Sequence, residues 1–149
     1  MEIVNLNLFD GKKVLVTGGH GFKGTWLCLA LQSLGATVLS YGLIGNSSIL
    51  LHSIIRSQAT SIEFVEGDIN SFDLLSQTVL RFSPEIVYHL AAEPLVSTGY
   101  EIPSTVFQTN TLGTVNLLEA CRLCKSVKSI VYLFILSYLL WLSFLIDLR

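Results

Sequence analysis

Val14-Leu15-Val16-Thr17-Gly18-Gly19-His20-Gly21-Phe22-Lys23-Gly24 is the stretch that decides the fold of this 149-residue chain. Its apolar start leads into the glycines, and a segment rich in apolar residues, 22–34, follows. A strand, a glycine turn and a helix in this order predict phosphate binding. We expect Gly18 to make the tight turn, Gly21 to leave room for a diphosphate, and Gly24 to let the helix pack closely on the sheet. The amides of the helix N-terminus would then face the anion.

The composition favours one folded domain. Apolar residues make up 51% of the chain and charged residues 13%, which argues against disorder. The net charge of −2 and the lack of a basic stripe argue against nucleic-acid binding. The N-terminus lacks a basic region followed by an apolar one, so we expect no signal peptide and a cytoplasmic location.

The chain has three cysteines, an odd number that fits a reducing compartment better than a disulfide framework. Cys121 and Cys124 form a C-x-x-C pair. We interpret the pair as two apolar-like residues one helical turn apart, because no second such pair or histidine cluster completes a metal site.

Strand-like and helix-like segments alternate along the chain. The expected strands are 12–17, 36–41, 61–66, 85–90 and 128–133, and the expected helices are 22–34, 46–57, 70–82 and 103–123. Gly35 would follow the first helix as a C-cap, and Asn70 would cap the third helix. Strands separated by helices pair in parallel with right-handed crossovers. Residues 1–132 therefore predict an α/β fold, an incomplete Rossmann-like, doubly wound parallel sheet of about five strands. The apolar strand Ile86-Val87-Tyr88 indicates a sheet covered on both faces.

Three further stretches fall where ligands bind in such a sheet, near the carboxyl ends of its strands. In Gly67-Asp68-Ile69, the carboxylate of Asp68 either accepts a hydrogen bond from an adenine amino group or serves as a turn residue. His89-Leu90-Ala91-Ala92 offers small residues to a cofactor, and we interpret His89 as a hydrogen-bonded core histidine rather than a catalytic one. Asn110 is unfavourable inside a helix. It is either held by a hydrogen bond near the site or faces water.

Together these stretches resemble the extended short-chain dehydrogenase/reductase family of NAD-dependent epimerases and dehydratases. The family shows Thr-Gly-x-x-Gly-Phe-x-Gly after its first strand, Gly-Asp-Ile after the third, His-x-Ala-Ala after the fourth, and Asn-x-x-Gly-Thr in the next helix. More specifically, 21–27, 84–96 and 100–103 look like CDP-glucose 4,6-dehydratases, and the resemblance covers roughly residues 8–132.

This resemblance implies a lyase that holds NAD and converts CDP-glucose to a 4-keto-6-deoxy sugar for surface polysaccharides such as O-antigen. In that family a tyrosine takes the proton of the sugar 4-hydroxyl while hydride passes to NAD, and the hydride returns to C6 after loss of water. Another NAD-dependent sugar-nucleotide dehydratase or epimerase is the alternative. The family is often homo-oligomeric, and we expect no metal ligands. The expected cofactor-binding residues are Gly18, Gly21, Phe22, Lys23, Gly24, Asp68, Ile69, Leu90, Ala91, Ala92 and Asn110.

The chain departs from the family pattern at its catalytic and ribose-binding positions. No tyrosine is followed four residues later by lysine, and the Ser/Thr-Asp-Lys segment is absent, so we expect no catalytic residue and an inactive, truncated remnant. No Asp or Glu stands between Asp10 and Glu63, where a carboxylate usually binds the ribose. No basic cluster replaces it, which disfavours a 2′-phosphate. Glu93 stands where the family usually has Gln and adds a charge beside the nicotinamide end. We therefore expect weakened or absent NAD binding.

The segment 129–146 has no charged residue across 18 positions. As a helix it would be roughly 27 Å long, at the short edge of a membrane span. Basic residues precede it, which favours a cytoplasmic N-terminal side and a membrane-tethered, non-catalytic nucleotide-binding module. The alternative is a strand that begins at Ile130-Val131-Tyr132 and then loses its reading frame. We favour the frameshift for residues 133–149, because the family pattern stops inside this strand.

Overall fold

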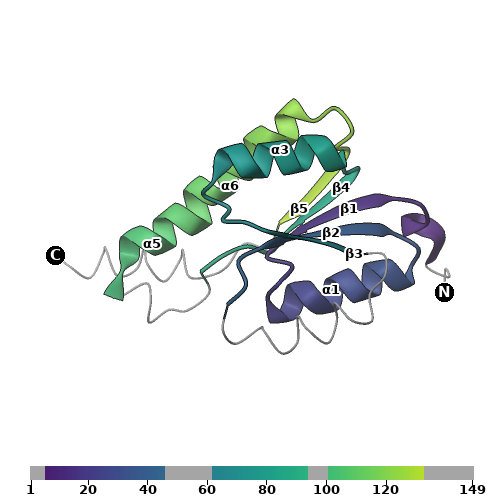
Figure 1. Ribbon diagram of the computed structural model, residues 1–149, viewed down its shortest axis with the longest axis horizontal. Coiled ribbons are helices and arrows are strands. Elements are labelled where there is room, and N and C mark those ends of the chain that lie inside the picture. Colours follow the sequence, from purple (N-terminus) through teal and green to yellow (C-terminus); the bar gives the residue numbers. More distant parts are fainter. Residues whose placement is uncertain (1–5, 46–61, 94–100, 133–149) are drawn as a thin grey trace, which may run out of the picture.

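The computed structural model describes residues 6–45, 62–93 and 101–132 (Figure 1). Five strands form one sheet in the order β3-β2-β1-β4-β5, and every neighbouring pair is parallel. The strands are β1 (Lys13–Thr17), β2 (Thr37–Gly42), β3 (Ile62–Glu66), β4 (Ile86–His89) and β5 (Ser129–Tyr132). From β1 the chain builds outward to β3 on one side and to β5 on the other. This reversal of strand order creates a crevice at the carboxyl ends. The predicted Rossmann-like sheet is confirmed.

Helices cover both faces of this sheet. One face carries α1, and the other carries α3 and α6 (Figure 1). The helical elements are η1 (Leu6–Phe9), α1 (Phe22–Ser33), α3 (Phe72–Phe82), α5 (Pro103–Phe107), the π-helical turn η2 (Gln108–Leu112) and α6 (Gly113–Leu123). The described chain is therefore doubly wound.

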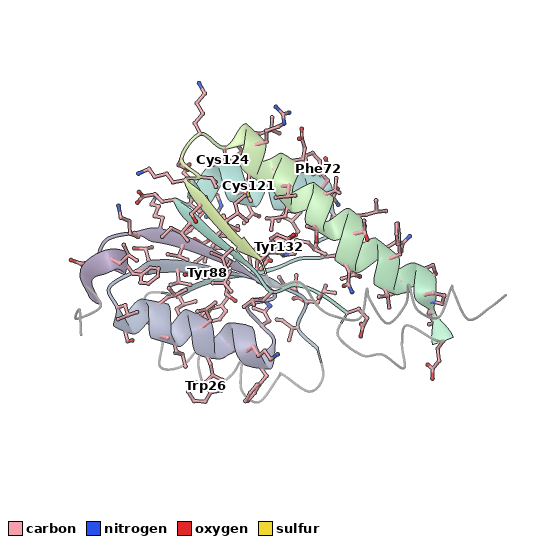
Figure 2. The ribbon with its side chains drawn as sticks, turned by 180° about the vertical axis from the view of Figure 1, so that it is seen from behind. Trp26, Phe72, Tyr88, Cys121, Cys124 and Tyr132 are labelled. Atoms are coloured by element: carbon pink, nitrogen blue, oxygen red, sulfur yellow. The ribbon has the colours of Figure 1, made fainter. Side chains whose placement is uncertain are left out.

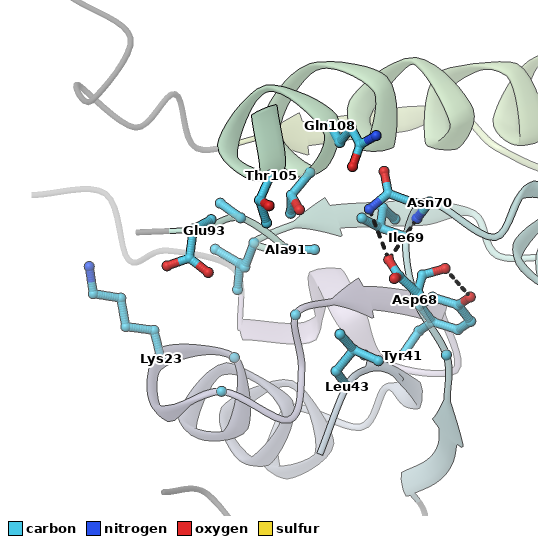
Figure 3. A pocket seen from close by; sticks show the side chains of 18 of the residues that line it. Lys23, Tyr41, Leu43, Asp68, Ile69, Asn70, Ala91, Glu93, Thr105 and Gln108 are labelled. Atoms are coloured by element: carbon cyan, nitrogen blue, oxygen red, sulfur yellow. Dashed lines mark hydrogen bonds between the residues drawn. The ribbon is translucent and has the colours of Figure 1, made fainter. Parts of the chain in front are cut away.

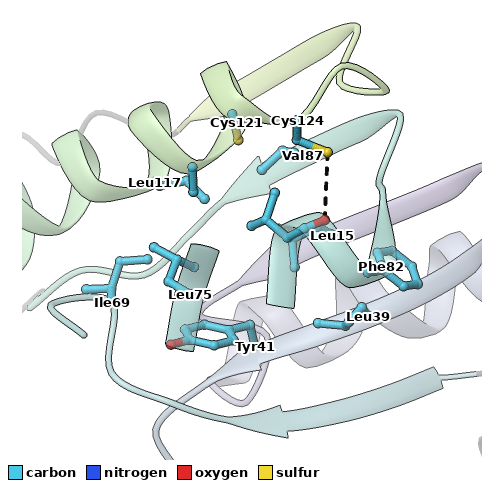
Figure 4. Close-up of a cluster of buried hydrophobic side chains, with 12 residues drawn as sticks. Leu15, Leu39, Tyr41, Ile69, Leu75, Phe82, Val87, Leu117, Cys121 and Cys124 are labelled. Atoms are coloured by element: carbon cyan, nitrogen blue, oxygen red, sulfur yellow. Dashed lines mark hydrogen bonds between the residues drawn. The ribbon is translucent and has the colours of Figure 1, made fainter. Parts of the chain in front are cut away.

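Alternation along the strands divides the core into two clusters. In β1, Leu15 faces α3 and α6, whereas Val14 and Val16 face α1. Figure 4 shows the first cluster, in which Leu15, Tyr41, Leu75 and Leu117 converge between the sheet and the two helices. A strand presents successive side chains to opposite faces, so apolar residues at consecutive positions require helices on both sides.

Coverage of the sheet decreases from its centre to β5. In β1 and β2 all residues after the first are buried. In β4, Val87 is buried while Ile86 and Tyr88 are only partly buried. In β5, Val131 and Tyr132 are 42% and 53% exposed. Among the described residues, the two faces of the sheet are therefore covered at its central strands, and this coverage decreases through β4 to β5.

Two expectations about the helices need correction. Asn70 does not cap α3, because its backbone N–H and its side-chain amide both donate to Asp68 Oδ1, at 2.9 and 3.1 Å. The helix begins at Phe72 instead, after Ser71. The expected helix 103–123 is continuous in direction but contains the π-helical turn η2, which includes Asn110.

The first helix matches its expected bounds to within one residue. It ends at Ser33, and Gly35 follows with φ +86°, the left-handed conformation that favours glycine at this position. Its buried residues are Gly24, Thr25, Cys28 and Leu31. Trp26 lies on the side turned away from the sheet and is 56% exposed (Figure 2).

The expected helix at 46–57 and the tail at 133–149 lie outside the described residues. Among the residues that are described, no helix combines the length and the hydrophobicity that crossing a membrane requires.

Candidate functional site

A cleft of about 660 Å³ opens at the carboxyl ends of the strands (Figure 3). Four segments form its walls: the glycine turn after β1, the ends of β2 and β3, the loop after β4, and the first turns of the helical segment that begins with α5. Every expected cofactor-binding residue except Asn110 lines it: Gly18, Gly21, Phe22, Lys23, Gly24, Asp68, Ile69, Leu90, Ala91 and Ala92. The remaining lining residues are Tyr41, Gly42, Leu43, Gly67, Asn70, Glu93, Thr105, Gln108 and Thr109.

The glycine turn is held by close backbone approach. Gly18 has φ +71°, and a Cβ atom there would lie 2.6 Å from the carbonyl carbon of Leu90 and from the nitrogen of Ala91. A Cβ atom on Gly24 would lie 2.7 Å from Gly19 Cα. Gly21 differs, because a Cβ atom there would meet only Gly18 O within 4 Å, at 3.3 Å. Gly18 and Gly24 are thus required by the protein's own backbone, whereas the space beside Gly21 is open.

The N-terminus of α1 meets the cleft at this turn. Gly21 is the N-cap residue, and no side chain caps the helix. The first N–H groups of a helix have no partner within it, and they carry partial positive charge. Lys23 adds a cation in the same turn, and Thr25 Oγ1 fixes the turn by donating to Gly19 O at 3.1 Å. This cradle therefore fits a diphosphate.

On one side of the glycine turn, the ends of β2 and β3 form an arm of the cleft. Tyr41 holds this arm together. Its hydroxyl donates to Asp68 O at 3.0 Å, and its ring lies where a Cβ atom on Gly67 would stand. Burial raises the pKa of Tyr41 to about 12, so the phenol stays neutral. Leu43, at the position beyond β2, is 61% exposed and lines the cleft.

On the other side, a chain of hydrogen bonds holds the loop after β4. Thr114 Oγ1 donates to Asn110 O at 2.8 Å, so its only proton is committed. His89 Nε2, 3.0 Å away, must then donate to Thr114. Burial lowers the pKa of His89 to about 4, so the ring is neutral and its Nδ1 accepts from the Thr17 hydroxyl at 2.6 Å. The interpretation of His89 as a hydrogen-bonded core histidine is confirmed.

Asn110 completes this chain of hydrogen bonds. Its Oδ1 accepts from the backbone N–H of Glu93 at 2.8 Å, and its Nδ2 donates to Glu93 O at 3.2 Å. Asn110 therefore positions the loop after β4 and is not among the residues that line the cleft, and its part in cofactor binding stays a prediction. Of the two alternatives stated for Asn110, the hydrogen bond near the site is correct.

Several residues of the site were missed by the sequence interpretation. Thr17 and Thr114 bind the two ring nitrogens of His89. Three more residues line the cleft from the helical side, namely Thr105, Gln108 and Thr109. The Asn-x-x-Gly-Thr pattern was a signal for Thr114, because it places the threonine one helical turn after Asn110.

The cysteines lie apart from this cleft. Cys28, Cys121 and Cys124 are buried free thiols. Figure 2 shows Cys121 and Cys124 on α6 and just after it, and both belong to the core cluster shared with α3. Burial raises the pKa of Cys121 to about 11. The interpretation of the C-x-x-C pair as core residues is confirmed. In the described ranges no group of three or more His, Cys, Asp or Glu residues could hold a metal ion.

Comparison with known proteins agrees with this geometry. The family model described as GDP-mannose 4,6 dehydratase matches residues 15–137. The chain belongs to the GDP-mannose 4,6 dehydratase family. The chain is 40% identical over 129 residues to CDP-glucose 4,6-dehydratase of Salmonella typhimurium. This alignment covers 87% of this chain and 36% of that protein. The chain is 31% identical over 120 residues to CDP-paratose 2-epimerase of Salmonella typhi, covering 80% of this chain and 36% of that protein.

Solved structures of related enzymes share the fold. Epimerase Mth375 of Methanothermobacter thermautotrophicus matches with a TM-score of 0.74 and 32% identity, over 85% of this chain and 36% of that one. UDP-glucose 4-epimerase of Brucella ovis, solved in complex with NAD, matches with a TM-score of 0.68 and 30% identity, over 82% of this chain and 35% of that one. The chain thus spans about a third of the length of these relatives. The resemblance to sugar-nucleotide dehydratases is confirmed at the level of the family.

Proposed function

We propose that the cleft binds NAD and that the chain is the cofactor-binding part of a sugar-nucleotide 4,6-dehydratase. One observation carries this proposal. A single cleft passes the N-terminus of α1, which no side chain caps, and extends into an arm on each side of that helix end. A diphosphate fits the helix end, and each arm then takes one nucleoside. NAD, when bound, supplies the hydride acceptor of the reaction.

Each wall has its own part in holding the cofactor. The amides of the first turn of α1 would hold the diphosphate beside Gly21, and Lys23 in the same turn would supply positive charge. Asp68 and Ile69 line the arm over β2 and β3 and would hold the adenine there, with the Asp68 carboxylate as a hydrogen-bond acceptor. The small residues 90–92 admit the nicotinamide half. Asn110 contributes indirectly, by fixing the backbone of Glu93.

We propose CDP-glucose as the nucleotide sugar of the complete enzyme. The 40% identity to the Salmonella typhimurium CDP-glucose 4,6-dehydratase supports it. A sugar-nucleotide epimerase is the second candidate, because CDP-paratose 2-epimerase and several UDP-sugar epimerases are also relatives. A cytoplasmic location and homo-oligomers belong to the same proposal.

We expect the 149-residue chain by itself to bind the cofactor without turning over the sugar. Position four after each tyrosine holds Gly45, Ala92, Ser104, Leu136 or Leu142, and none of these residues is a lysine. The lysine of a Tyr-x-x-x-Lys pair would lower the pKa of the tyrosine toward the working pH. Leu43 also stands near where a ribose-binding carboxylate is usual, so we expect weakened affinity for NAD.

Calorimetric titration of the full chain with NAD⁺ tests the binding. We expect one NAD⁺ per chain, and Gly21→Leu abolishes binding because its side chain fills the diphosphate space. The backbone at Gly21, with φ −76° and ψ 169°, suits any residue, and a Cβ atom there would have one tight contact, with Gly18 O at 3.3 Å, so this variant should fold. Gly11→Ala, outside the cleft, is the control and should bind normally. No binding at saturating NAD⁺, or binding that survives Gly21→Leu, would contradict the proposal.

Mass spectrometry of CDP-glucose incubated with NAD⁺ and the chain tests the expectation that the chain alone does not turn over the sugar. We expect no loss of water from the sugar. A dehydrated product would show that residues of this chain other than a Tyr-x-x-x-Lys pair perform the chemistry.

A further inference from the structure

Among the described residues that line the cleft, three are charged, namely Lys23, Asp68 and Glu93, and they are distributed unevenly over it. Lys23 belongs to the glycine turn, Asp68 follows β3, and Glu93 follows β4. In the sheet order β3-β2-β1-β4-β5, the ends of β3 and β4 lie on opposite sides of the turn after β1. Of these described lining residues, each arm of the cleft therefore has one carboxylate. Figure 3 shows Lys23 and Glu93 toward one side of the view and Asp68 with Tyr41 toward the other.

The two carboxylates meet different halves of a dinucleotide. In doubly wound sheets, the residue that distinguishes the ribose 2′-hydroxyl of NAD from the 2′-phosphate of NADP lies beyond the second strand. Both groups belong to the adenosine half, so that half occupies the arm over β2 and β3, with Asp68. The nicotinamide half occupies the arm over β4, with Glu93. The nicotinamide ring carries a positive charge in NAD⁺ and none in NADH, whereas the adenosine half is the same in both forms.

The position of Glu93 is fixed by the fold. Its backbone N–H and carbonyl are both bound by the side chain of Asn110, at 2.8 and 3.2 Å. Thr114 binds the carbonyl of Asn110 and also His89, which in turn binds Thr17 at the end of β1. The loop that bears the carboxylate is thus tied to the strand that leads into the glycine turn.

We propose that Glu93 makes the cleft selective for the oxidised cofactor, by placing a negative charge beside the cationic nicotinamide of NAD⁺. This inference rests on the proposed function, and it replaces the expectation that the charge of Glu93 weakens the binding of NAD⁺. A partly exposed charge pair is worth up to about a fivefold change in affinity, so we expect Glu93 to favour NAD⁺ over NADH by roughly two- to fivefold. Lys23, in the same cleft, opposes this preference, and salt should weaken it.

The test compares the dissociation constants of NAD⁺, NADH and ADP for the full chain and for Glu93→Gln. Glutamine has the size of glutamate without its charge. We expect Glu93→Gln to lower the preference for NAD⁺ roughly two- to fivefold. Affinity for ADP should stay unchanged, because ADP lacks the nicotinamide half. The change should shrink at high salt.

Asp68→Asn is the matched control, since it removes a carboxylate from the other arm. It should change the affinities for NAD⁺ and NADH by the same factor and leave their ratio intact. An NAD⁺/NADH ratio that Glu93→Gln does not alter, in a chain that binds both forms, would overturn this inference and leave the proposed function standing. If NAD⁺, NADH and ADP all fail to bind, the proposed function itself is wrong, and the inference is overturned with it.

Discussion

Two of the walls of the cleft, the glycine turn and the loop after β4, are shaped by opposite means. The glycine turn depends on missing side chains, because the backbones of Gly18 and Leu90 approach each other too closely to admit a Cβ atom. The loop after β4 depends on side chains that are present, because Asn110 binds the backbone of Glu93. The glycine turn should not tolerate an added side chain, whereas the loop after β4 should not tolerate the loss of a side chain that binds its backbone. The two walls should therefore fail under different substitutions.

The largest expected effect is that of Gly18→Ala. Gly18 combines a left-handed conformation with backbone atoms that would lie 2.6 Å from the Cβ atom of an alanine, so we expect a loss of about 3 kcal/mol or more in the free energy of unfolding. Gly11→Ala is the matched control, because Gly11 has a similar φ of +67° with nothing within 4 Å of a Cβ atom. It should lose only about 1 kcal/mol. Urea unfolding measures both, and equal losses would show that close approach does not hold this wall.

The hydrogen bonds behind the loop after β4 should make the free energy of unfolding depend on pH, because they include His89. The pKa of His89 falls from 6.5 to about 4 on folding, because burial disfavours the charged ring. Between these values the unfolded chain binds a proton that the folded chain excludes, so stability falls as the pH drops from about 6.5 to about 4. Each pKa unit corresponds to about 1.4 kcal/mol, which gives a loss of up to about 3 kcal/mol. Comparing urea unfolding of the parent and of His89→Phe across this range isolates the effect. An unchanged slope in the variant would contradict the assignment.

At neutral pH, we expect His89→Phe to lower the free energy of unfolding by about 2 kcal/mol, less than Gly18→Ala does. It leaves the hydroxyl of Thr17, which is fully buried, without its acceptor. Adding Thr17→Val removes the stranded hydroxyl, so the double variant should recover part of the loss. Thermal unfolding of the two single variants and the double variant completes a cycle. Strictly additive losses would show that the two side chains do not interact.

The smallest effect is expected from Asn110→Ala, about 1 kcal/mol in global stability. Its main result should be local, with faster hydrogen exchange at the amide of Glu93. Asn116→Ala is the matched control, because Asn116 lies on α6 and binds the carbonyls of Ile69 and Asn70 at 3.2 and 3.3 Å. It should loosen the loop after β3 and leave the Glu93 amide protected. Acceleration at Glu93 in both variants would mean that the two arms open together.

The same contrast explains what the sequence could predict. The glycine turn is a local structure, in which Gly21 N–H donates to Gly18 O, so its pattern is visible in a few consecutive residues. The strands and their parallel pairing follow from the alternation of apolar segments with helices. The cap of α3 was wrong because Asn70 bonds to Asp68 within the preceding turn, and both residue types serve as turn formers as well as caps.

The wall after β4 could not be predicted in this way. Its contacts join residues 72, 25 and 17 positions apart, namely Thr17 with His89, His89 with Thr114, and Glu93 with Asn110. Contacts at such separations depend on the folded sheet. The low helix propensity of Asn110 indicates an irregular position but does not specify a π-helical turn, although such turns are frequent at functional sites.

The most direct test of the account is an NMR titration of the isotope-labelled chain with NAD⁺ and, separately, with ADP. If the two walls form one dinucleotide site, NAD⁺ shifts the amides of both the glycine turn, 21–24, and the loop after β4, 90–93. ADP should shift the glycine turn and the Asp68 amide but leave the amide of Glu93 in place. Shifts by NAD⁺ that are absent, or that are confined to one wall, would contradict the claim that the cleft is a single cofactor site.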